Sequence, residues 1–293
     1  MKVCVWQNTT KSGIGDRLQD ILLVLSYSRY HNCDKLLMKW ITIKQCGNSG
    51  HVKERPKFRE LDQKIDIMKK YIKFPDDLII TNNPSSVKYK SKIDFSNYLG
   101  GVYSKNTFIS KHGLNKEKYS KIYDQVIDDF GFISNNYFDI IDKTDKLLAV
   151  HLRRTDKVMD NINQANAALG ITKNQLKNLN ENTIIIINKY IEKGYKNITF
   201  ISDSIVEKNN YITLYKDKCT IIDINGNLES GEQTYIDLYS LIKADIIIMS
   251  QQWSNFSVIS SILGKNKLVY FDKEYINKYK YNDSNNYIFY KDV

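Results

Sequence analysis

The residues best suited to chemistry form one short run at 151–157, HLRRTDK, which holds a histidine, three cations and a carboxylate. Four apolar residues, 147–150, come directly before the run and predict a short buried strand that ends ahead of His151. Ligands of open α/β sheets bind just beyond the carboxyl ends of the strands. Because arginine holds phosphate oxygens in a bidentate fork, Arg153 and Lys157 would suit a diphosphate at that position.

Side chains alternate in direction along an extended chain, and this alternation separates the other members of the run. His151 would pack or hydrogen-bond near a nucleoside. Arg154 would point the other way and pair with Asp156. A surface patch of ion pairs is the alternative interpretation of the same residues.

Polar side chains also follow a strand expected at 197–201. Ser202 and Asp203 could accept hydrogen bonds from a ribose or a base, or they could cap the next helix. Further on, Asp237 lies in a segment with helical spacing of its apolar residues. A carboxylate that faces a cleft from such a helix could accept two N–H bonds from the edge of a guanine.

A third polar segment, 250–257, follows a strand expected at 246–249 and leads into a helix. Exposed N–H groups and hydroxyls at the N-terminus of a helix form a ready anion site. Ser254, Asn255 and Phe256 are therefore candidates for contact with a phosphate. The alternative is an ordinary helix cap, with Ser254 as the capping residue.

The N-terminal segment has a glycine-containing loop of its own after its first strand. Gly13, Gly15, Asp16 and Arg17 open a helix there, but the third glycine of a dinucleotide fingerprint and the GK[ST] of a P-loop are missing. Facing a cleft from the first domain, the loop could close on a sugar diphosphate. Otherwise it is a tight turn in which Asp16 benefits from the helix dipole.

Strands that alternate with helices predict an α/β fold with parallel, doubly wound sheets. We expect an N-terminal domain at 1–145 on the acceptor side, with irregular insertions. A nucleotide-binding domain at 146–272 follows it, and a tail at 273–293 packs back on the first domain. The expected strands are 2–6, 35–38, 147–150, 197–201, 220–223, 246–249 and 268–271, and the expected helices are 14–30, 183–191, 233–244 and 254–264.

Composition narrows the class of protein. The net charge is +10, with 25 Lys/Arg against 17 Asp/Glu in residues 1–150, so anionic ligands are favoured. A nucleic-acid-binding module is one alternative, although the surplus is diffuse and no recognition motif is visible. The basic segment 53–73 is either an acceptor-binding lobe or a solvated insertion. The four cysteines form no CxxC pair and no Asp-x-Asp triplet occurs, so we expect no metal and no cofactor.

No apolar run approaches the roughly 20 residues that span a bilayer. The sequence MKVCVWQ at the start turns polar without the apolar core of a signal peptide. These features predict a cytoplasmic location and free thiols.

Four of these segments, in their order, resemble the fucosyltransferase superfamily that uses GDP-fucose. The run 151–158 looks most like the α1,6-fucosyltransferases and, more loosely, the Nod-factor enzymes. Segment 200–204 resembles the second motif of that superfamily, and Asp237 with segment 254–257 resembles its third. Segment 13–18 is similar to the N-terminal loop shared with the α1,2 branch.

The resemblance implies a GT-B-like architecture, in which two Rossmann-type domains with parallel sheets face each other across a cleft. It implies metal-independent, inverting transfer of fucose from GDP-fucose to a glycan hydroxyl. By matching position, Arg153 and Lys157 would hold the β-phosphate, with His151 beside the nucleoside. Asp237 would read guanine, and the start of the third-motif helix at Ser254 would contact the diphosphate.

One position departs from the family pattern. A glutamate ten residues past the motif histidine is the general base in the α1,6 family, and here that position is Asn161. Asp160 or Asp156 would have to substitute. A donor other than GDP-fucose, such as GDP-mannose or a UDP-sugar, and an inactive relative that binds GDP or glycans are the alternatives. The acceptor, the linkage and the oligomeric state stay open.

Overall fold

A computed structural model covers the 293-residue chain. It describes residues 1–7, 13–40, 64–95, 104–153, 158–159, 171–227, 230–251, 254–273 and 286–293. Their contacts divide the chain into two compact units. The first contains described residues of Met1–Ser134 and Gly226–Tyr235, and the second those of Asn135–Asn225, Ile236–Lys278 and Asn282–Val293. We expected a boundary between residues 145 and 146, whereas the first crossing lies between Ser134 and Asn135.

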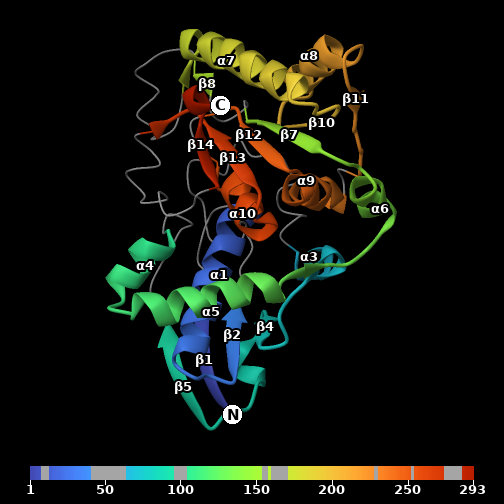
Figure 1. Ribbon diagram of the computed structural model, residues 1–293. Coiled ribbons are helices and arrows are strands. Elements are labelled where there is room, and N and C mark those ends of the chain that lie inside the picture. The colour runs from blue at the N-terminus through green and yellow to red at the C-terminus, as the bar shows by residue number, and fades with distance from the viewer. Residues whose placement is uncertain are drawn as a thin grey trace. The chain divides into compact units, whose positions relative to one another are not determined.

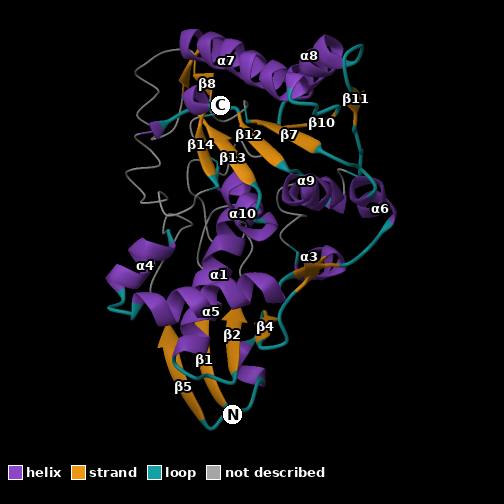
Figure 2. Ribbon diagram, in the orientation of Figure 1, coloured by secondary structure: helices purple, strands orange, loops and turns teal. Residues whose placement is uncertain are grey.

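The first unit is built on a four-stranded sheet in which every strand pair is parallel, in the order β4-β2-β1-β5. Helices α1 and α5, purple in Figure 2, lie against this sheet. A short antiparallel pair joins β3 to β6. The strands are β1 (Lys2–Gln7), β2 (Lys35–Lys39), β3 (Ile72–Lys73), β4 (Leu78–Thr81), β5 (Ser91–Phe95) and β6 (Gly131–Phe132). The helices are α1 (Ile14–Tyr30), α3 (Ile65–Tyr71), α4 (Lys105–Lys111) and α5 (Lys116–Asp129), with a 3-10 turn at Pro84–Ser86.

The first strand and helix agree with their predicted bounds to within a residue. Helix α1 is buried along most of its length, since its apolar residues occupy more than one face. Helices α4 and α5 begin at side-chain caps. Asn115 accepts a hydrogen bond from the Lys118 N–H at 2.9 Å, and Ser104 accepts one from the Thr107 N–H at 3.2 Å.

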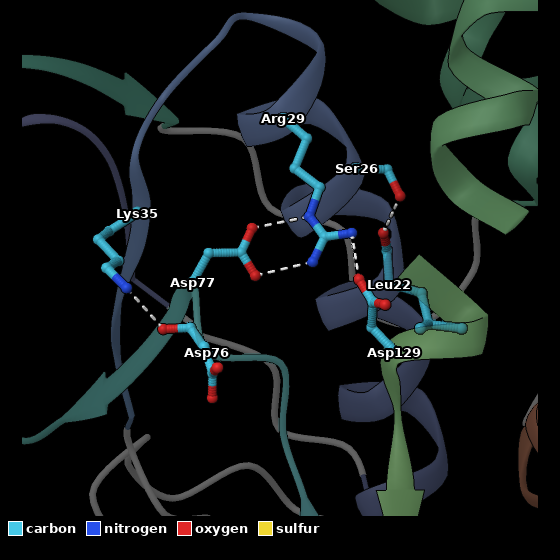
Figure 3. Close-up of polar contacts among 7 residues, drawn as sticks. All are labelled: Leu22, Ser26, Arg29, Lys35, Asp76, Asp77 and Asp129. Carbon is cyan, nitrogen blue, oxygen red and sulfur yellow. Dashed lines mark hydrogen bonds and ion pairs between the residues drawn. The ribbon is translucent and has the colours of Figure 1, made fainter. Parts of the chain in front are cut away.

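Arg29, at the end of α1, ties three parts of the first unit together (Figure 3). Its Nε and Nη2 donate to the two oxygens of Asp77 at 2.7 and 2.8 Å, and its Nη1 donates to Asp129 at 2.6 Å. Asp77 lies just before β4, and Asp129 is the last residue of α5. The fork geometry of the guanidinium therefore fixes the sheet edge against both helices. These contacts raise the pKa of Arg29 above its usual value, the Asp77 bond most.

The second unit is built on a six-stranded sheet in the order β11-β10-β7-β12-β13-β14, again with parallel pairs throughout. Figure 1 shows α7 and α8 along one side of this sheet and α9 and α10 along the other. The strands are β7 (Leu147–Leu152), β10 (Asn197–Ser202), β11 (Thr220–Ile221), β12 (Ile246–Met249), β13 (Lys267–Tyr270) and β14 (Tyr287–Phe289). The helices are α6 (Asn136–Asp142), α7 (Lys173–Glu192), α8 (Ile205–Tyr215), α9 (Glu232–Lys243) and α10 (Asn255–Gly264), and the chain closes with a 3-10 turn at Tyr290–Asp292. A separate parallel pair joins β8 (Val158–Met159) to β9 (Ile171–Thr172).

The core of the second unit explains why its central strands read as unbroken apolar runs. Every residue of β7 is buried, because β10 and β12 flank the strand and helices cover both faces. One side of the sheet packs on α7 and α8 through Ile186, Ile187, Tyr211 and Tyr215. A strand covered on both faces has no alternation of polar and apolar residues.

Several bounds differ from the sequence prediction. Strand β7 continues through Leu152, since its pairing with β10 extends that far. His151 therefore lies inside the strand and not beyond it. Helix α7 begins at Lys173, ten residues before its predicted start at Thr183, and β11 ends at Ile221 instead of residue 223.

The end of α10 also differs in detail. Lys265 takes the left-handed conformation that ends the helix, with φ of 54°, and Gly264 is still helical. Gly264 is needed for another reason, because a Cβ there would collide with the main-chain oxygen of Ile242. The side chain of Asn266 reinforces this contact by donating to the Leu241 and Ile242 oxygens at 2.8 and 3.1 Å.

The C-terminal segment was expected to pack on the first domain. Its described end, β14, instead pairs with β13 and becomes the last strand of the second sheet. No helix in the described parts of the chain has the length and apolar character needed to cross a membrane.

Candidate functional site

The carboxyl ends of three neighbouring strands in the second unit meet at one level. The register pairs Ser202 of β10 with Leu152 of β7, and Met249 of β12 with His151. The chain leaves these strands at Arg153, Asp203 and Ser250. The polar segments predicted after β7, β10 and β12 therefore share one edge of the sheet, where ligands of such folds bind.

His151 is held from two sides at this edge. Its ring is 7% exposed, and its Nδ1 lies 2.7 Å from the Ser257 hydroxyl and 3.3 Å from the Gln251 amide nitrogen. The ring of Phe256 lies 5.6 Å away, centre to centre. His151 is therefore an anchored, mostly buried group beside the start of α10.

The main chain of Arg153 is fixed by the same glutamine. Its N–H donates to the Gln251 side-chain oxygen at 2.8 Å. Arg153 itself is partly exposed, as a ligand-binding cation at a sheet edge must be. Its predicted companions Arg154, Asp156, Lys157, Asp160 and Asn161 lie outside the described residues.

The turn between β12 and α10 is anchored at its first residue. Ser250 is fully buried, and its N–H donates to the His151 main-chain oxygen at 3.0 Å. Its hydroxyl lies 2.7 Å from the hydroxyl of Thr183 on α7. These bonds tie the start of the turn to β7 and to a helix on the sheet face.

Ser254 precedes α10 and is 1% exposed, yet its hydroxyl has no hydrogen-bond partner among the described residues and does not cap the helix. Asn255 and Phe256 follow as the first helical residues and are partly buried. The first N–H groups of a helix have no partner within it, and the helix dipole favours negative charge there. A buried hydroxyl without a partner at this place is suited to an anionic ligand.

At the end of β10 the hydroxyl of Ser202 is used within the fold. It donates to the Leu152 oxygen at 2.7 Å and accepts from the Ser204 N–H at 3.0 Å. Ser204, not Ser202 or Asp203, caps α8. Asp203 lies partly exposed between them at the sheet edge.

Asp237 lies on α9 and is partly buried. The helix that carries it is held firmly two residues later, where the Tyr239 hydroxyl donates to Asp142 at 2.8 Å and its ring stacks on Phe138 at 3.8 Å. Burial raises the pKa of Tyr239 to about 12, with Asp142 contributing, so its hydroxyl stays a donor at neutral pH.

The glycine loop belongs to the first unit. Gly13 precedes α1 with φ of −72°, a conformation open to any residue, and a Cβ there would meet no described atom within 4 Å. Gly15 is buried and Asp16 partly buried in the first turn, as the dipole argument predicts for a carboxylate. Arg17 is fully buried, and its guanidinium lies 4.7 Å from the centre of the Trp40 ring.

Sequence analysis included Gln251 and Ser257 only as members of segment 250–257 and did not assign a role to either, and it did not single out Thr183. Their bonds to His151, Arg153 and Ser250 link the strand ends. Among the described residues, no group of three or more His, Cys, Asp or Glu side chains is arranged to hold a metal ion.

Comparison with known proteins finds solved structures with a similar fold. No protein-family model matches the chain, and no curated protein matches its sequence. The crystal structure of fucosyltransferase NodZ from Bradyrhizobium aligns over 89% of this chain and 93% of its own, with a TM-score of 0.50 and 11% identity. NodZ α-1,6-fucosyltransferase soaked with GDP-fucose gives a TM-score of 0.49 at 14% identity, covering 93% and 96% of the two chains. POFUT1 in complex with GDP gives 0.45 at 13% identity, covering 92% and 98%.

The likeness to NodZ from Bradyrhizobium concerns the fold. The predicted α/β class with parallel sheets is confirmed, and the chain shares its GT-B-like fold with the structure of NodZ from Bradyrhizobium.

Proposed function

We propose that this protein is a glycosyltransferase that moves fucose from GDP-fucose to a glycan hydroxyl, with inversion and without a metal ion. One observation carries the proposal. The buried, unpartnered hydroxyl of Ser254 lies at the N-terminus of α10, on the turn that follows β12. The fold shared with fucosyltransferase NodZ makes fucosyl transfer the first activity to test.

The proposed reaction needs negative charge to be stabilised on the departing diphosphate. Arg153 and Lys157 would supply charge-assisted hydrogen bonds, and the first turn of α10 would add N–H donors. Such donors lower the barrier most when they are fixed before the reaction starts. The hydrogen bond from the Arg153 N–H to the Gln251 side chain fixes the main chain of one of these donors.

The sugar itself passes through an oxocarbenium-like transition state, as in other glycosyl chemistry. An acceptor hydroxyl then attacks the anomeric carbon on the face opposite the diphosphate and loses its proton. Asp160 or Asp156 would accept that proton as general base. Asp237 would select guanine by accepting two N–H bonds from its edge, with Ser202 and Asp203 near the ribose or base.

A second candidate is a relative that binds GDP or a glycan and transfers nothing. The observation that favours it is Asn161, an amide in the position where the resembling family has its catalytic glutamate. An amide cannot take a proton at neutral pH. A donor such as GDP-mannose is the other variant of the proposal.

Titration calorimetry with GDP, GDP-fucose, GDP-mannose and UDP-galactose, each with EDTA present, tests the donor. We expect tight binding of GDP and GDP-fucose alone. Ser254→Ala should weaken GDP binding about tenfold, since a hydrogen bond to a charged group contributes about 1.5–3 kcal/mol. Ser260→Ala is the matched control, because the Ser260 hydroxyl donates to the Phe256 oxygen inside the same helix.

The absence of any guanine-nucleotide binding would overturn the proposal. Binding without transfer to any of a panel of glycan acceptors would favour the inactive relative. Transfer that EDTA abolishes and Mg²⁺ or Mn²⁺ restores would reject the metal-free mechanism.

A further inference from the structure

Gln251 bridges the two residues on which the proposed donor site depends. Its side chain is 1% exposed and lies between the main chain of Arg153 and the ring of His151. The amide oxygen accepts from the Arg153 N–H at 2.8 Å, and the amide nitrogen lies 3.3 Å from His151 Nδ1. Its own N–H donates to the Met249 oxygen at 2.8 Å, so the residue is fixed at both ends.

The chemistry of the amide settles which end faces which partner. A main-chain N–H can only donate, so the Gln251 end that faces Arg153 must be the carbonyl oxygen. The NH₂ group therefore faces His151, and it too can only donate. The reversed amide would set two donors against each other at Arg153 and leave a buried N–H without a partner, which is unfavourable.

His151 Nδ1 must then be the acceptor of this contact. The Ser257 hydroxyl, 2.7 Å from the same Nδ1, could donate or accept if it acted alone. Since an Nδ1 that accepts from Gln251 carries no hydrogen, the hydroxyl donates as well, and both donors share the one lone pair of Nδ1. A neutral imidazole with an unprotonated Nδ1 carries its hydrogen on Nε2.

We infer that Gln251 is a positioning residue that keeps the proton of neutral His151 on Nε2 while it fixes the main chain of Arg153. This inference rests on the proposed function only where it concerns the ligand. There, a proton on Nε2 would make His151 a donor and not an acceptor toward an oxygen of the nucleoside or phosphate. Ser257 assists from α10, so the tautomer and the start of that helix are set together.

The tautomer can be measured without any nucleotide. The chain has four histidines, so long-range ¹H–¹⁵N spectra of the ¹⁵N-histidine-labelled protein are simple to assign, with His151→Gln identifying the signal. We expect wild-type His151 to show the pattern of a proton on Nε2. A pattern with the proton on Nδ1 would overturn the inference without any variant of Gln251.

Gln251→Glu tests the cause. Its carboxylate has the same shape and still accepts from the Arg153 N–H, but its second oxygen accepts instead of donating. We expect the His151 proton to move to Nδ1. Gln233→Glu is the matched control, since Gln233, in the first turn of α9, also accepts a main-chain N–H, from Gly226 at 2.7 Å. An unchanged His151 pattern in folded Gln251→Glu would overturn the inference.

GDP binding separates this inference from the proposed function. If both hold, Gln251→Glu weakens GDP binding at least tenfold and Gln233→Glu does not. If the wild-type protein shows the Nε2 tautomer and binds no guanine nucleotide, the inference stands and the proposed function fails. If GDP binds and the tautomer is on Nδ1, the proposed function stands and the role of Gln251 is wrong.

Discussion

The two units share parallel strands covered by helices, yet three buried polar atoms without a hydrogen-bond partner among the described residues lie in different surroundings. In the second unit the Ser254 hydroxyl lies at a helix N-terminus that follows a strand end. In the first unit the other two such atoms are the Nε2 atoms of His31 and His112. The ring of His31 lies 4.3 Å from that of Tyr27, and the ring of His112 lies 4.4 Å from that of Phe108, centre to centre.

A buried polar atom without a partner costs free energy in either place. At the start of α10 an anionic ligand could recover that cost, because fixed donors already surround it. Within the aromatic cluster the cost is lowest when the imidazoles stay neutral. The same deficit is consistent with the proposed anion site in the second unit and predicts a sensitivity to acid in the first.

The largest effect should come from removing the cation of the second-unit edge. Arg153→Ala should lower kcat/KM for fucosyl transfer by 100-fold or more, which corresponds to about 3 kcal/mol of transition-state stabilisation. Steady-state kinetics with GDP-fucose measure this loss. A variant with kcat/KM near the wild-type value would show that Arg153 does not bind the donor. The second-unit edge would then have no more evidence for a role in the reaction than the first unit.

The next largest effect concerns the packing that supports the edge. Gly264→Ala should lower the free energy of unfolding by about 1–3 kcal/mol, because the new methyl group collides with the Ile242 oxygen. Denaturant titration measures the loss. Lys265→Gly is the control, since it relieves a left-handed residue and should not destabilise the protein. Equal stability of Gly264→Ala and wild type would mean that α10 can move away from α9.

A smaller effect should separate the two carboxylates that bind Arg29 in the first unit. Asp77→Asn weakens a paired, partly buried contact and should cost about 1–2 kcal/mol of stability. Asp129 is half exposed, so Asp129→Asn should cost less than about 1 kcal/mol. Neither change should alter GDP binding. Loss of GDP binding in folded Asp77→Asn would show that the Arg29 contacts also serve the donor site.

The fold class could be predicted from the sequence because apolar runs report burial directly. β12 and α1 were predicted within a residue, since β12 is a continuous apolar run and α1 has an apolar centre at Ile21–Leu25. The start of α7 at Lys173 could not be predicted, because its first turns are rich in Asn, Gln and Lys. These turns are helical because they continue into the apolar second half of the helix. Local pattern carries no sign of such tertiary support.

Only some residues of the candidate site could be predicted from the sequence. His151 and Ser254 were found because they follow predicted strands, which places them at one sheet edge. Gln251 and Thr183 were not found as site residues, since their roles depend on contacts 98 and 67 residues along the chain, to Arg153 and Ser250. Spacing within a segment predicts which residues share an edge, but not which of them bond across it.

We expect acid to lower the free energy of unfolding modestly, through His31 and His112 of the first unit. Burial lowers the pKa of His31 and His112 below the ordinary value, with Lys2 and Lys118 adding to the effect at His31 and Lys111 at His112. The unfolded chain therefore takes up these protons first. Their contribution to stability is complete above about pH 6.5 and is lost as the pH falls through the folded-state pKa values.

Unfolding titrations between pH 5 and about pH 8 measure this dependence. His112→Phe keeps an aromatic ring and removes the titrating group, so the loss of stability on acidification should be smaller than in wild type. Ser254→Ala should leave the dependence on pH unchanged. A dependence that is the same in His112→Phe and in wild type would mean that this histidine does not carry the effect.

The smallest effect on stability is expected at Gly13, which differs from Gly264 in its surroundings. Its backbone conformation suits alanine, and no described atom lies within 4 Å of the new Cβ, so Gly13→Ala should change the free energy of unfolding by less than about 1 kcal/mol. Gly264 serves packing, and Gly13 has no such role. If Gly13 instead lets the main chain approach the sugar diphosphate, Gly13→Ala will lower kcat/KM while stability is kept. Unchanged stability together with unchanged kcat/KM would leave the loop of the first unit without a part in the reaction, and donor binding would then rest on the second-unit edge alone.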